Sequence, residues 1–290
     1  MISYKVQFKI YIKKLIKTVI PHCIIQYIKK LLTRKKFFFQ VQLADHCNLN
    51  CIGCSHFSPV ADEYFLDTND YENDCKRFSQ LVKKHVSRID LMGGEPLLHA
   101  GINKIIEITR NNFPNTAIDI FTNGILLKQM NTTFWKTCNQ NNITIVLTQY
   151  PISIDLKKIH ELCSEYNVKF ITTSSDSLSF FRKDIYDHNG LQNNDKSFNN
   201  CLKRECHHLY NGKFYLCPSP PYIKYLNKYF GMNFNVKSDD YIDIYKVKNI
   251  RPFLKYIKNP IPFCRYCRNE NFTKIKWELS KRDISEWTLI

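Results

Sequence analysis

The sequence contains few glycines, few alanines and no long run of apolar residues. Its 290 residues include eight glycines and only four alanines, so glycines that gather in one region require a local explanation. A mean hydropathy of -0.35 with 44% hydrophobic residues excludes a polytopic membrane protein and a disordered chain. We therefore predict a soluble, folded chain of about two domains.

Acidic residues are absent from the first 36 positions. Met1–Lys36 holds ten Lys or Arg residues, in a chain whose 42 basic and 26 acidic residues give a net charge of +16. Apolar residues recur there at helical spacing, and Pro21 divides them into two amphipathic helices. Such helices suit either an anionic membrane surface or the protein core, and both interpretations stay open here. Lysines interrupt the apolar residues, so we expect no secretory signal and therefore a cytoplasmic protein. The basic segment could attach this protein to the inner face of the membrane.

Cysteines are abundant and clustered. Three of the twelve, Cys47, Cys51 and Cys54, lie within eight residues. In a reducing cytoplasm such clusters are more often metal ligands or redox groups than disulfides. Structural zinc takes four protein ligands, whereas a four-iron cluster held by three cysteines keeps one iron open for another ligand. A zinc site that recruits His46 or His56 remains the alternative.

Short β-rich segments alternate with helical ones after residue 37. The expected strands are 37–43, 88–92, 117–121, 143–148 and 169–172, and the expected helices are 67–84, 102–111, 132–141 and 156–166. This alternation predicts βαβ units and a parallel sheet. The polar stretch 174–200 is predicted to be a linker or mobile loop, and Asn211-Gly212 then predicts a β-hairpin between 207–210 and 213–217.

The scarce glycines gather where strands end. Four of the eight, Gly53, Gly93, Gly94 and Gly124, follow three successive expected strands, which is where an α/β barrel builds its site. Paired glycines let a backbone approach a ligand closely, and the carboxylate of Glu95 can accept a hydrogen bond from an amine.

The Cys-x3-Cys-x2-Cys loop after the first strand, with Gly-Gly-Glu-Pro after the second, resembles the radical S-adenosylmethionine (radical SAM) superfamily over about residues 37–180. The resemblance implies an α/β fold with a partial (β/α)6 barrel. It implies that Cys47, Cys51 and Cys54 hold a site-differentiated [4Fe-4S] cluster, whose open iron binds S-adenosyl-L-methionine. It assigns cofactor contacts to Gly93, Gly94, Glu95, Pro96, Asn123 and Thr148. Gly53 stands where the family often has an aromatic residue near the adenine, so Phe57 is expected to supply that contact.

A second group of cysteines follows residue 200. Cys201, Gly212 and Cys217, with the later Cys264-x2-Cys267, resemble the SPASM or twitch extension of radical SAM enzymes. The resemblance implies a small hairpin-plus-helix domain with an auxiliary [4Fe-4S] cluster on Cys201, Cys217, Cys264 and Cys267. Cys206 is a rival for the place of Cys201, and a zinc site on the same thiolates is the alternative. We expect the hairpin to pair with the open edge of the parallel sheet and to bring Cys217 near the carboxyl ends of the strands.

The resemblance predicts a radical SAM enzyme of oxidoreductase or maturase type, with divisions at 1–36, 37–200 and 201–290. Reductive cleavage of S-adenosyl-L-methionine would yield a 5′-deoxyadenosyl radical that abstracts hydrogen from a peptide or carbohydrate-type substrate, in a dehydrogenation or a peptide modification. An electron donor such as flavodoxin or ferredoxin is an expected partner, and nucleic acid is not. The alternatives are a catalytically silent, zinc-stabilised binding protein and a protein that binds membranes or nucleic acid through its basic segment.

Overall fold

A computed structural model describes residues 36–173, 180–183, 185–269 and 273–288. The two helices predicted before Lys36 lie outside the described residues. Phe37–Ile290 forms one compact unit, and the account below concerns that unit alone.

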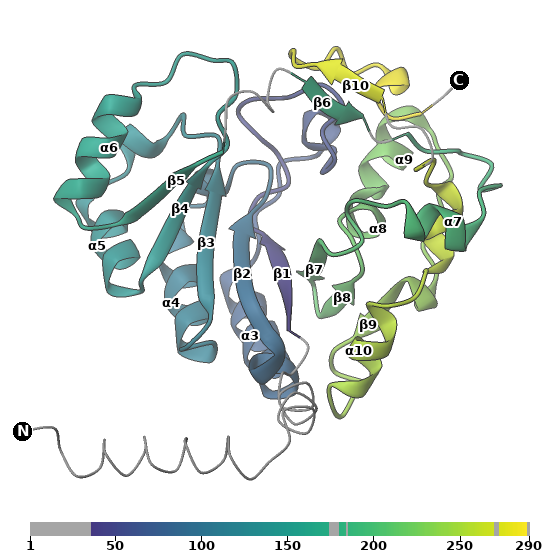
Figure 1. Cartoon of the computed structure of the whole chain (residues 1–290), viewed down its shortest axis with the longest axis horizontal. Helices are drawn as coiled ribbons and strands as arrows, with labels where there is room; N and C mark the ends of the chain where they lie inside the picture. The colour runs from purple at the N-terminus through teal and green to yellow at the C-terminus, as the bar shows by residue number, and fades with distance from the viewer. Residues whose placement is uncertain (1–35, 174–179, 184, 270–272, 289–290) are drawn as a thin grey trace, which may run out of the picture. The chain divides into compact units, whose positions relative to one another are not determined.

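An eight-stranded sheet runs through this unit (Figure 1). Its order is β5-β4-β3-β2-β1-β7-β8-β9, in which β1 to β5 and β7 are parallel and β8 and β9 are antiparallel. The strands are β1 (Phe37–Gln42), β2 (Val86–Met92), β3 (Ala117–Thr122), β4 (Ile143–Leu147), β5 (Lys169–Thr172), β7 (His207–Tyr210), β8 (Lys213–Tyr215) and β9 (Tyr241–Asp243). The sheet is not closed, because β5 and β9 form its two edges, and the predicted α/β fold with a partial barrel is confirmed.

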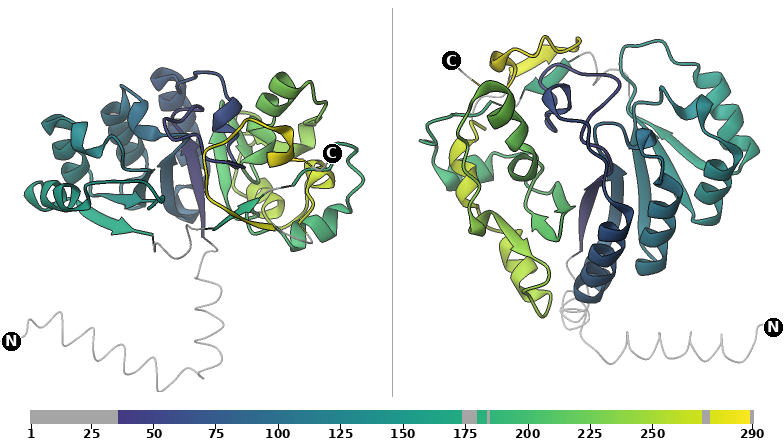
Figure 2. Two further views of the ribbon diagram at one scale, coloured as in Figure 1. Left: turned by 90° about the horizontal axis from the view of Figure 1, so that it is seen from above. Right: turned by 180° about the vertical axis from the view of Figure 1, so that it is seen from behind.

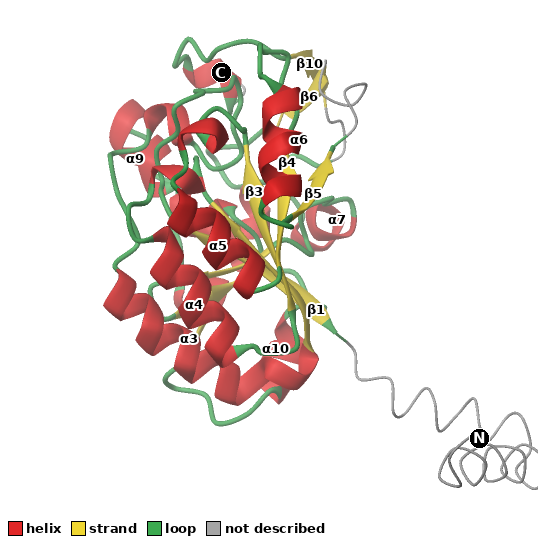
Figure 3. Cartoon of the chain, turned by 90° about the vertical axis from the view of Figure 1, so that its left-hand side faces the viewer, coloured by secondary structure: helices red, strands yellow, loops and turns green. Residues whose placement is uncertain are grey.

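Four helices lie together on one side of β1 to β5 (Figures 2 and 3). They are α3 (Thr68–Val82), α4 (Ile102–Asn112), α5 (Thr132–Gln140) and α6 (Leu156–Glu165), and each follows a strand as the alternation predicts. In β2, Ile89 and Leu91 are buried in the core that faces these helices. Arg88 and Asp90 alternate with them and therefore occupy the opposite, concave face.

The remaining helices belong to the second half of the unit and surround a separate aromatic core. They are α7 (Asn194–Asn199), α8 (Ser219–Tyr222), α9 (Lys224–Phe230) and α10 (Arg251–Tyr256). Tyr186, Tyr222, Phe263 and Trp287 are fully buried in this core. No helix in the described parts of the chain is long and apolar enough to cross a membrane.

The stretch 174–200 is more structured than the sequence suggests. β6 (Phe180–Lys183) pairs antiparallel with β10 (Thr273–Lys276), and α7 follows. The prediction of a linker is therefore wrong for these residues, because a partner strand about ninety residues later, which no local pattern indicates, completes the pair.

The hairpin of β7 and β8 has the predicted turn and the predicted neighbour. Asn211 and Gly212 both have positive φ, 47° and 71°, as a two-residue turn of this kind requires. β7 pairs in parallel with β1, with Phe39 opposite His207. The expected position of Cys217 is wrong, however: β8 runs antiparallel to β7, so the chain leaves it toward the amino end of β1, not the carboxyl ends.

Candidate metal and cofactor site

The loop that follows β1 is shaped by residues with left-handed backbone conformations. Asn50, Gly53 and Phe57 have φ values of 52°, 58° and 58°. The backbone N–H of Leu49 donates to Cys47 Sγ at 3.4 Å. The resulting bends direct Cys47, Cys51 and Cys54 to one cavity of about 210 Å³, which all three residues line.

Residues from the carboxyl ends of β2, β3 and β4 complete the cavity. Of the predicted cofactor contacts, Gly93, Gly94, Asn123 and Thr148 line it. Sequence reasoning missed several other lining residues: Met92, Phe121, Tyr150, Ser55 and Ser58. Their position at strand ends, or directly after the third cysteine, is the signal that could have identified them.

Gly93 and Gly94 let the loop after β2 pack against the cysteine loop. A Cβ atom on Gly94 would lie 2.0 Å from the carbonyl oxygen of His46, so no side chain fits there. The Gly94 N–H donates to the Ala44 carbonyl at 2.7 Å, and the Glu95 N–H donates to the His46 carbonyl at 3.2 Å. The glycines therefore place the two loops in contact as well as lining the cavity.

Glu95 has a different role from the predicted one. Its carboxylate is fully buried, does not line the cavity, and accepts hydrogen bonds from Thr122 Oγ1 (2.7 Å), the Asn123 N–H (2.9 Å) and the Leu97 N–H (3.1 Å). Burial raises the pKa of Glu95 to about 7, against these hydrogen bonds, which lower it. In this structure Glu95 therefore positions the loop after β3.

Phe57 and Pro96 are also turned away from the cavity. Phe57 is fully buried in the second aromatic core, 6.4 Å from the Trp287 ring between ring centroids. Pro96 is buried at the start of a short 3-10 helix, Pro96–Leu98. Neither lines the cavity, and their contacts with the cofactor stay predictions. A left-handed Phe57 backbone aims its ring inward, which the sequence does not reveal.

Asn123 connects the β3 loop to the cysteine loop. Its Nδ2 donates to Asn48 Oδ1 at 2.7 Å and lies 3.7 Å from Cys47 Sγ. Its backbone N–H is held by Glu95. Glu95 and Asn123 thus form a chain of contacts that ends at the first cysteine.

The thiols of the loop fit a group that binds as thiolates. Burial raises the pKa of Cys47 to about 11 and of Cys51 to about 12, and the neighbouring cysteines add to both increases. Tyr150 and Trp277 interact with Cys51 and lower its pKa. Such buried, mutually repelling thiolates are stable only when a cation neutralises them. In the described ranges, no three His, Cys, Asp or Glu side chains are gathered closely enough around one point to hold a single metal ion.

The histidines considered for a zinc site differ in placement. His56 lines the cavity, whereas the His46 ring packs edge-on against Phe65, with 4.8 Å between ring centroids.

The second group of cysteines lies in the other half of the unit, close enough for electrostatic effects between its members but with no three of them gathered around one point. Cys201 and Cys264 contribute charge that raises the pKa of Cys217, and Cys201, Cys217 and Cys264 do the same for Cys267. Cys206 instead lies near the charges of Arg88 and Asp90. Cys201 is the one cysteine whose charge contributes to the raised pKa of Cys206.

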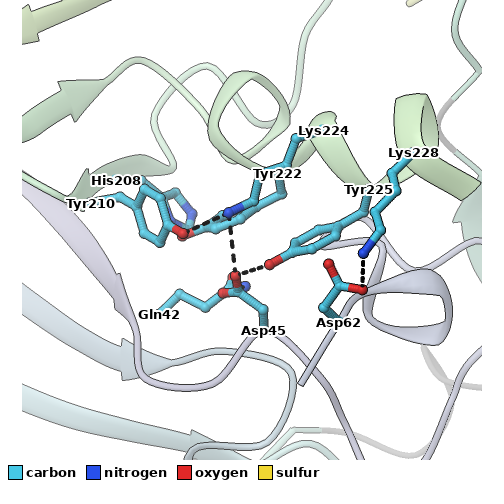
Figure 4. Close-up of polar contacts among 9 residues, drawn as sticks. All are labelled: Gln42, Asp45, Asp62, His208, Tyr210, Tyr222, Lys224, Tyr225 and Lys228. Atoms are coloured by element: carbon cyan, nitrogen blue, oxygen red, sulfur yellow. Dashed lines mark hydrogen bonds and ion pairs between the residues drawn. The ribbon is translucent and has the colours of Figure 1, made fainter. Parts of the chain in front are cut away.

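A buried network ties the cysteine loop to α9 (Figure 4). Asp45, two residues before Cys47, is fully buried and accepts hydrogen bonds from Tyr225 Oη and from Gln42 Nε2 (2.7 Å). Lys224 Nζ lies 3.9 Å from Asp45 Oδ2 and donates to Tyr210 Oη at 2.8 Å. The start of the loop is therefore anchored to the second half of the unit.

Residues 37–171 match the protein family described as "4Fe-4S single cluster domain". The cavity formed by the Cys-x3-Cys-x2-Cys loop and the Gly-Gly loop lies inside this match. Over these residues the chain is similar to the radical SAM superfamily. This superfamily is one of enzymes. The description of the matched family agrees with the [4Fe-4S] cluster predicted for the loop that holds Cys47, Cys51 and Cys54.

Individual relatives match this chain only in part. It is 36% identical over 97 residues to a GTP 3',8-cyclase of Clostridium acetobutylicum, which is 32% of this chain and 29% of the relative. It is also 36% identical over 89 residues to a probable GTP 3',8-cyclase of Methanothermobacter thermautotrophicus, 31% of this chain and 28% of the relative. The chain thus spans less than a third of the length of these curated relatives.

The fold has a solved counterpart. The crystal structure of BtrN in complex with AdoMet and 2-DOIA superposes with a TM-score of 0.50, at 18% identity, over 82% of this chain and 95% of that one. At this identity the likeness concerns the fold alone, and it extends beyond the barrel into the second half of the unit.

Proposed function

We propose that this protein is a radical SAM enzyme that cleaves S-adenosyl-L-methionine reductively and abstracts hydrogen from a peptide or carbohydrate-type substrate. One observation carries the proposal: three thiols from the loop after β1 open onto one cavity with Gly93, Gly94, Asn123 and Thr148 from the next strand ends. When bound, the cluster and S-adenosyl-L-methionine supply the electron and the 5′-deoxyadenosyl radical for this chemistry.

The protein's own residues hold and enclose the reacting groups. Cys47, Cys51 and Cys54 would bind three irons and leave the fourth open, because no other cysteine of the described residues lines the cavity. Asn123 holds the Cys47 end of the loop in place. Met92 and Phe121 give the cavity apolar walls, which exclude water and protect a radical from unwanted hydrogen donors.

The concave face of the sheet is where we infer that the substrate lies. Arg88 there is 39% exposed and pairs with Asp90 at 2.6 Å, with Asp119 3.7 Å away. Phe121, which lines the cavity, lies beneath the same guanidinium, 6.0 Å from its centre. Hydroxyl and amide groups could bind such a face, and both proposed substrate classes carry them.

We also propose that residues 201–290 act as an auxiliary-cluster domain beside a core of residues 37–200. The mutual electrostatic effects of Cys201, Cys217, Cys264 and Cys267 support this ligand set, with Cys201 preferred to Cys206. Such a cluster could accept the electron left on a substrate radical, while a flavodoxin or ferredoxin reduces the first cluster.

For residues 1–36 we propose attachment to an anionic membrane surface from the cytoplasmic side. Ten basic residues without an acidic one support this proposal. Each basic residue close to an anionic surface adds about 1 kcal/mol of binding free energy. Co-sedimentation with anionic and with neutral vesicles at low salt tests it. Equal binding to both would contradict it.

Anaerobic reconstitution tests the enzymatic proposal. The wild-type protein should bind iron and sulfide, and after reduction it should convert S-adenosyl-L-methionine to 5′-deoxyadenosine. Cys51→Ala should abolish this conversion, whereas Cys75→Ala, a buried cysteine of α3, should leave it. The proposal would be overturned if the Cys51→Ala variant converted S-adenosyl-L-methionine as fast as the wild-type protein does. Zinc in place of iron in the reconstituted protein would also overturn it.

A further inference from the structure

The end of the chain lies directly against the cysteine loop. Residues 277–287, here called the C-terminal strap, follow β10 and run beside the loop (Figure 1). The Ile52 N–H donates to the Glu278 carbonyl at 2.9 Å, and the Ser280 N–H donates to the Asn50 carbonyl at 2.8 Å. Cys51 and Leu279 face each other in this short antiparallel bridge. The strap therefore binds the residues directly before and after Cys51.

A single carboxylate joins the strap to the loop between Cys51 and Cys54. Glu286 is buried, and its Oε2 accepts from the Gly53 N–H at 3.1 Å and from Ser280 Oγ at 2.7 Å. Its Oε1 accepts from the Lys281 N–H at 2.8 Å. A buried side chain that accepts this many hydrogen bonds fixes the path of both segments.

Two tryptophans of the strap reach the loop. Trp287 is fully buried, and its Nε1 donates to the Cys54 carbonyl at 2.9 Å. Trp277 Nε1 is buried and makes no regular hydrogen bond within the described part of the chain. Trp277 stands two residues before Leu279, which faces Cys51, and its ring lies 6.1 Å between centroids from that of Tyr150, which lines the cavity.

We propose that the C-terminal strap is a working part of the metal site: Glu286 and Trp287 position the cysteine loop, and the Trp277 N–H donates to the sulfur of Cys51 when a cluster is bound. The inference rests on the proposed [4Fe-4S] cluster of the cysteine loop. It explains why a buried indole N–H has no hydrogen-bond partner among the described residues, which is costly unless a bound group supplies one.

The proposal has a consequence for the reduction potential. A hydrogen bond to a cluster sulfur stabilises the more negative, reduced state and so raises the potential. Trp277→Phe keeps an aromatic ring and removes the N–H. At a fixed solution potential the ratio of reduced to oxidised cluster should then fall about fivefold, as expected for loss of one ordinary hydrogen bond. Trp277 is a positioning residue here, because it acts through Cys51.

An anaerobic redox titration followed by electron paramagnetic resonance tests this consequence. Three proteins are compared: a parent that is wild type at both tryptophans, its Trp277→Phe variant and the matched control Trp135→Phe. In the parent, the Trp135 indole N–H donates to the Met130 carbonyl in the helical layer. To follow the first cluster alone, all three carry Cys264→Ala and Cys267→Ala. A lower midpoint for Trp277→Phe, with the control at the wild-type value, supports the proposal. The same midpoint in all three overturns it.

Glu286→Gln tests the mechanical role of the strap. The amide NH2 of the glutamine would face one of the N–H groups that now donate to the carboxylate. That hydrogen bond would be lost, so the cysteine loop should loosen. Iron retained after anaerobic gel filtration should fall at least twofold. Glu278→Gln is the control, because that side chain is exposed on the same segment. Equal retention by the two variants would overturn the positioning role. If the wild-type protein itself binds no iron, the proposed function fails instead, so the two failures are distinguishable.

Discussion

At the scale of single residues, the site depends on a carboxylate that is buried without a cation. Glu95 is held by three hydrogen-bond donors, yet burial raises its pKa from 4.5 to about 7. The folded protein therefore binds a proton at Glu95 more tightly than the unfolded chain does. Stability must then depend on pH in the range between these two values.

We predict that this dependence disappears in Glu95→Gln. Because the folded pKa is raised, the contribution of Glu95 to stability is complete below about pH 4.5, falls as pH rises toward 7, and is constant above that. The difference in unfolding free energy between wild-type and variant apoprotein should follow this curve. Urea unfolding at several pH values measures it.

The exposed Glu165 provides the control for this measurement. Glu165→Gln should leave the pH profile of the wild type unchanged. In addition, the amide introduced by Glu95→Gln would meet the Asn123 N–H, at a cost of about 1–3 kcal/mol. A flat difference curve across the acidic range would contradict the buried-carboxylate interpretation.

The thiols of the cysteine loop lead to a second prediction at this scale. With pKa values of about 11 for Cys47 and about 12 for Cys51, both are protonated in the apoprotein at neutral pH. Iron binding must displace these protons, so cluster assembly should be faster at higher pH, by about tenfold per pH unit if one deprotonation limits the rate. Visible absorbance during anaerobic assembly measures the rate. A rate that does not change with pH would count against the assignment.

At the scale of elements, the hairpin of β7 and β8 is the piece that extends the parallel sheet. Its turn places Gly212 at φ 71°, with the N–H donating to Asp74 Oδ2 of α3 at 2.6 Å. A Cβ atom on Gly212 would also lie 3.1 Å from Cε2 of Tyr245. The turn is thus restricted both by its own backbone and by two neighbours.

Gly212→Ala should therefore lower the unfolding free energy by about 1–2 kcal/mol, the cost of a left-handed backbone for a residue with a side chain. Asn211→Gly is the matched control, because glycine adopts φ 47° without strain. Thermal or urea unfolding of the three proteins measures the effect. Equal destabilisation by the two substitutions would show that the turn conformation is not the cause.

At the scale of the whole molecule, the two halves of the described unit share one sheet. β1 of the first half lies between β2 and β7, and Asp45 receives one of its hydrogen bonds from Tyr225 of the second half. A fragment that ends at residue 200 would expose the edge of β1 and leave the Asp45 carboxylate short of donors, both of which are unfavourable.

We therefore predict that residues 37–200 alone do not fold cooperatively, whereas residues 37–290 do. Circular dichroism melting and size-exclusion chromatography of the two fragments measure this. A monomeric 37–200 fragment with a sharp melting transition would show that the shared sheet is unnecessary for folding of the first half.

The sequence by itself determined the order of β1 to β5 and of α3 to α6, the cysteine loop and the glycines beside it. These features follow from local rules: apolar residues repeat with the period of a strand or a helix, and metal ligands on one loop must be close in sequence. The Asn211-Gly212 turn is of the same kind, since its backbone conformation depends on those two residues.

Only the tertiary structure decided which groups face the cavity and which lie behind it. Glu95 turns to Asn123 and Phe57 turns to Trp287, although both stand next to residues that line the cavity. Gly53 meets Glu286 across 233 positions of the chain. Contacts of this range are fixed by how the sheet and the aromatic core pack together, and no local pattern in the sequence carries that information.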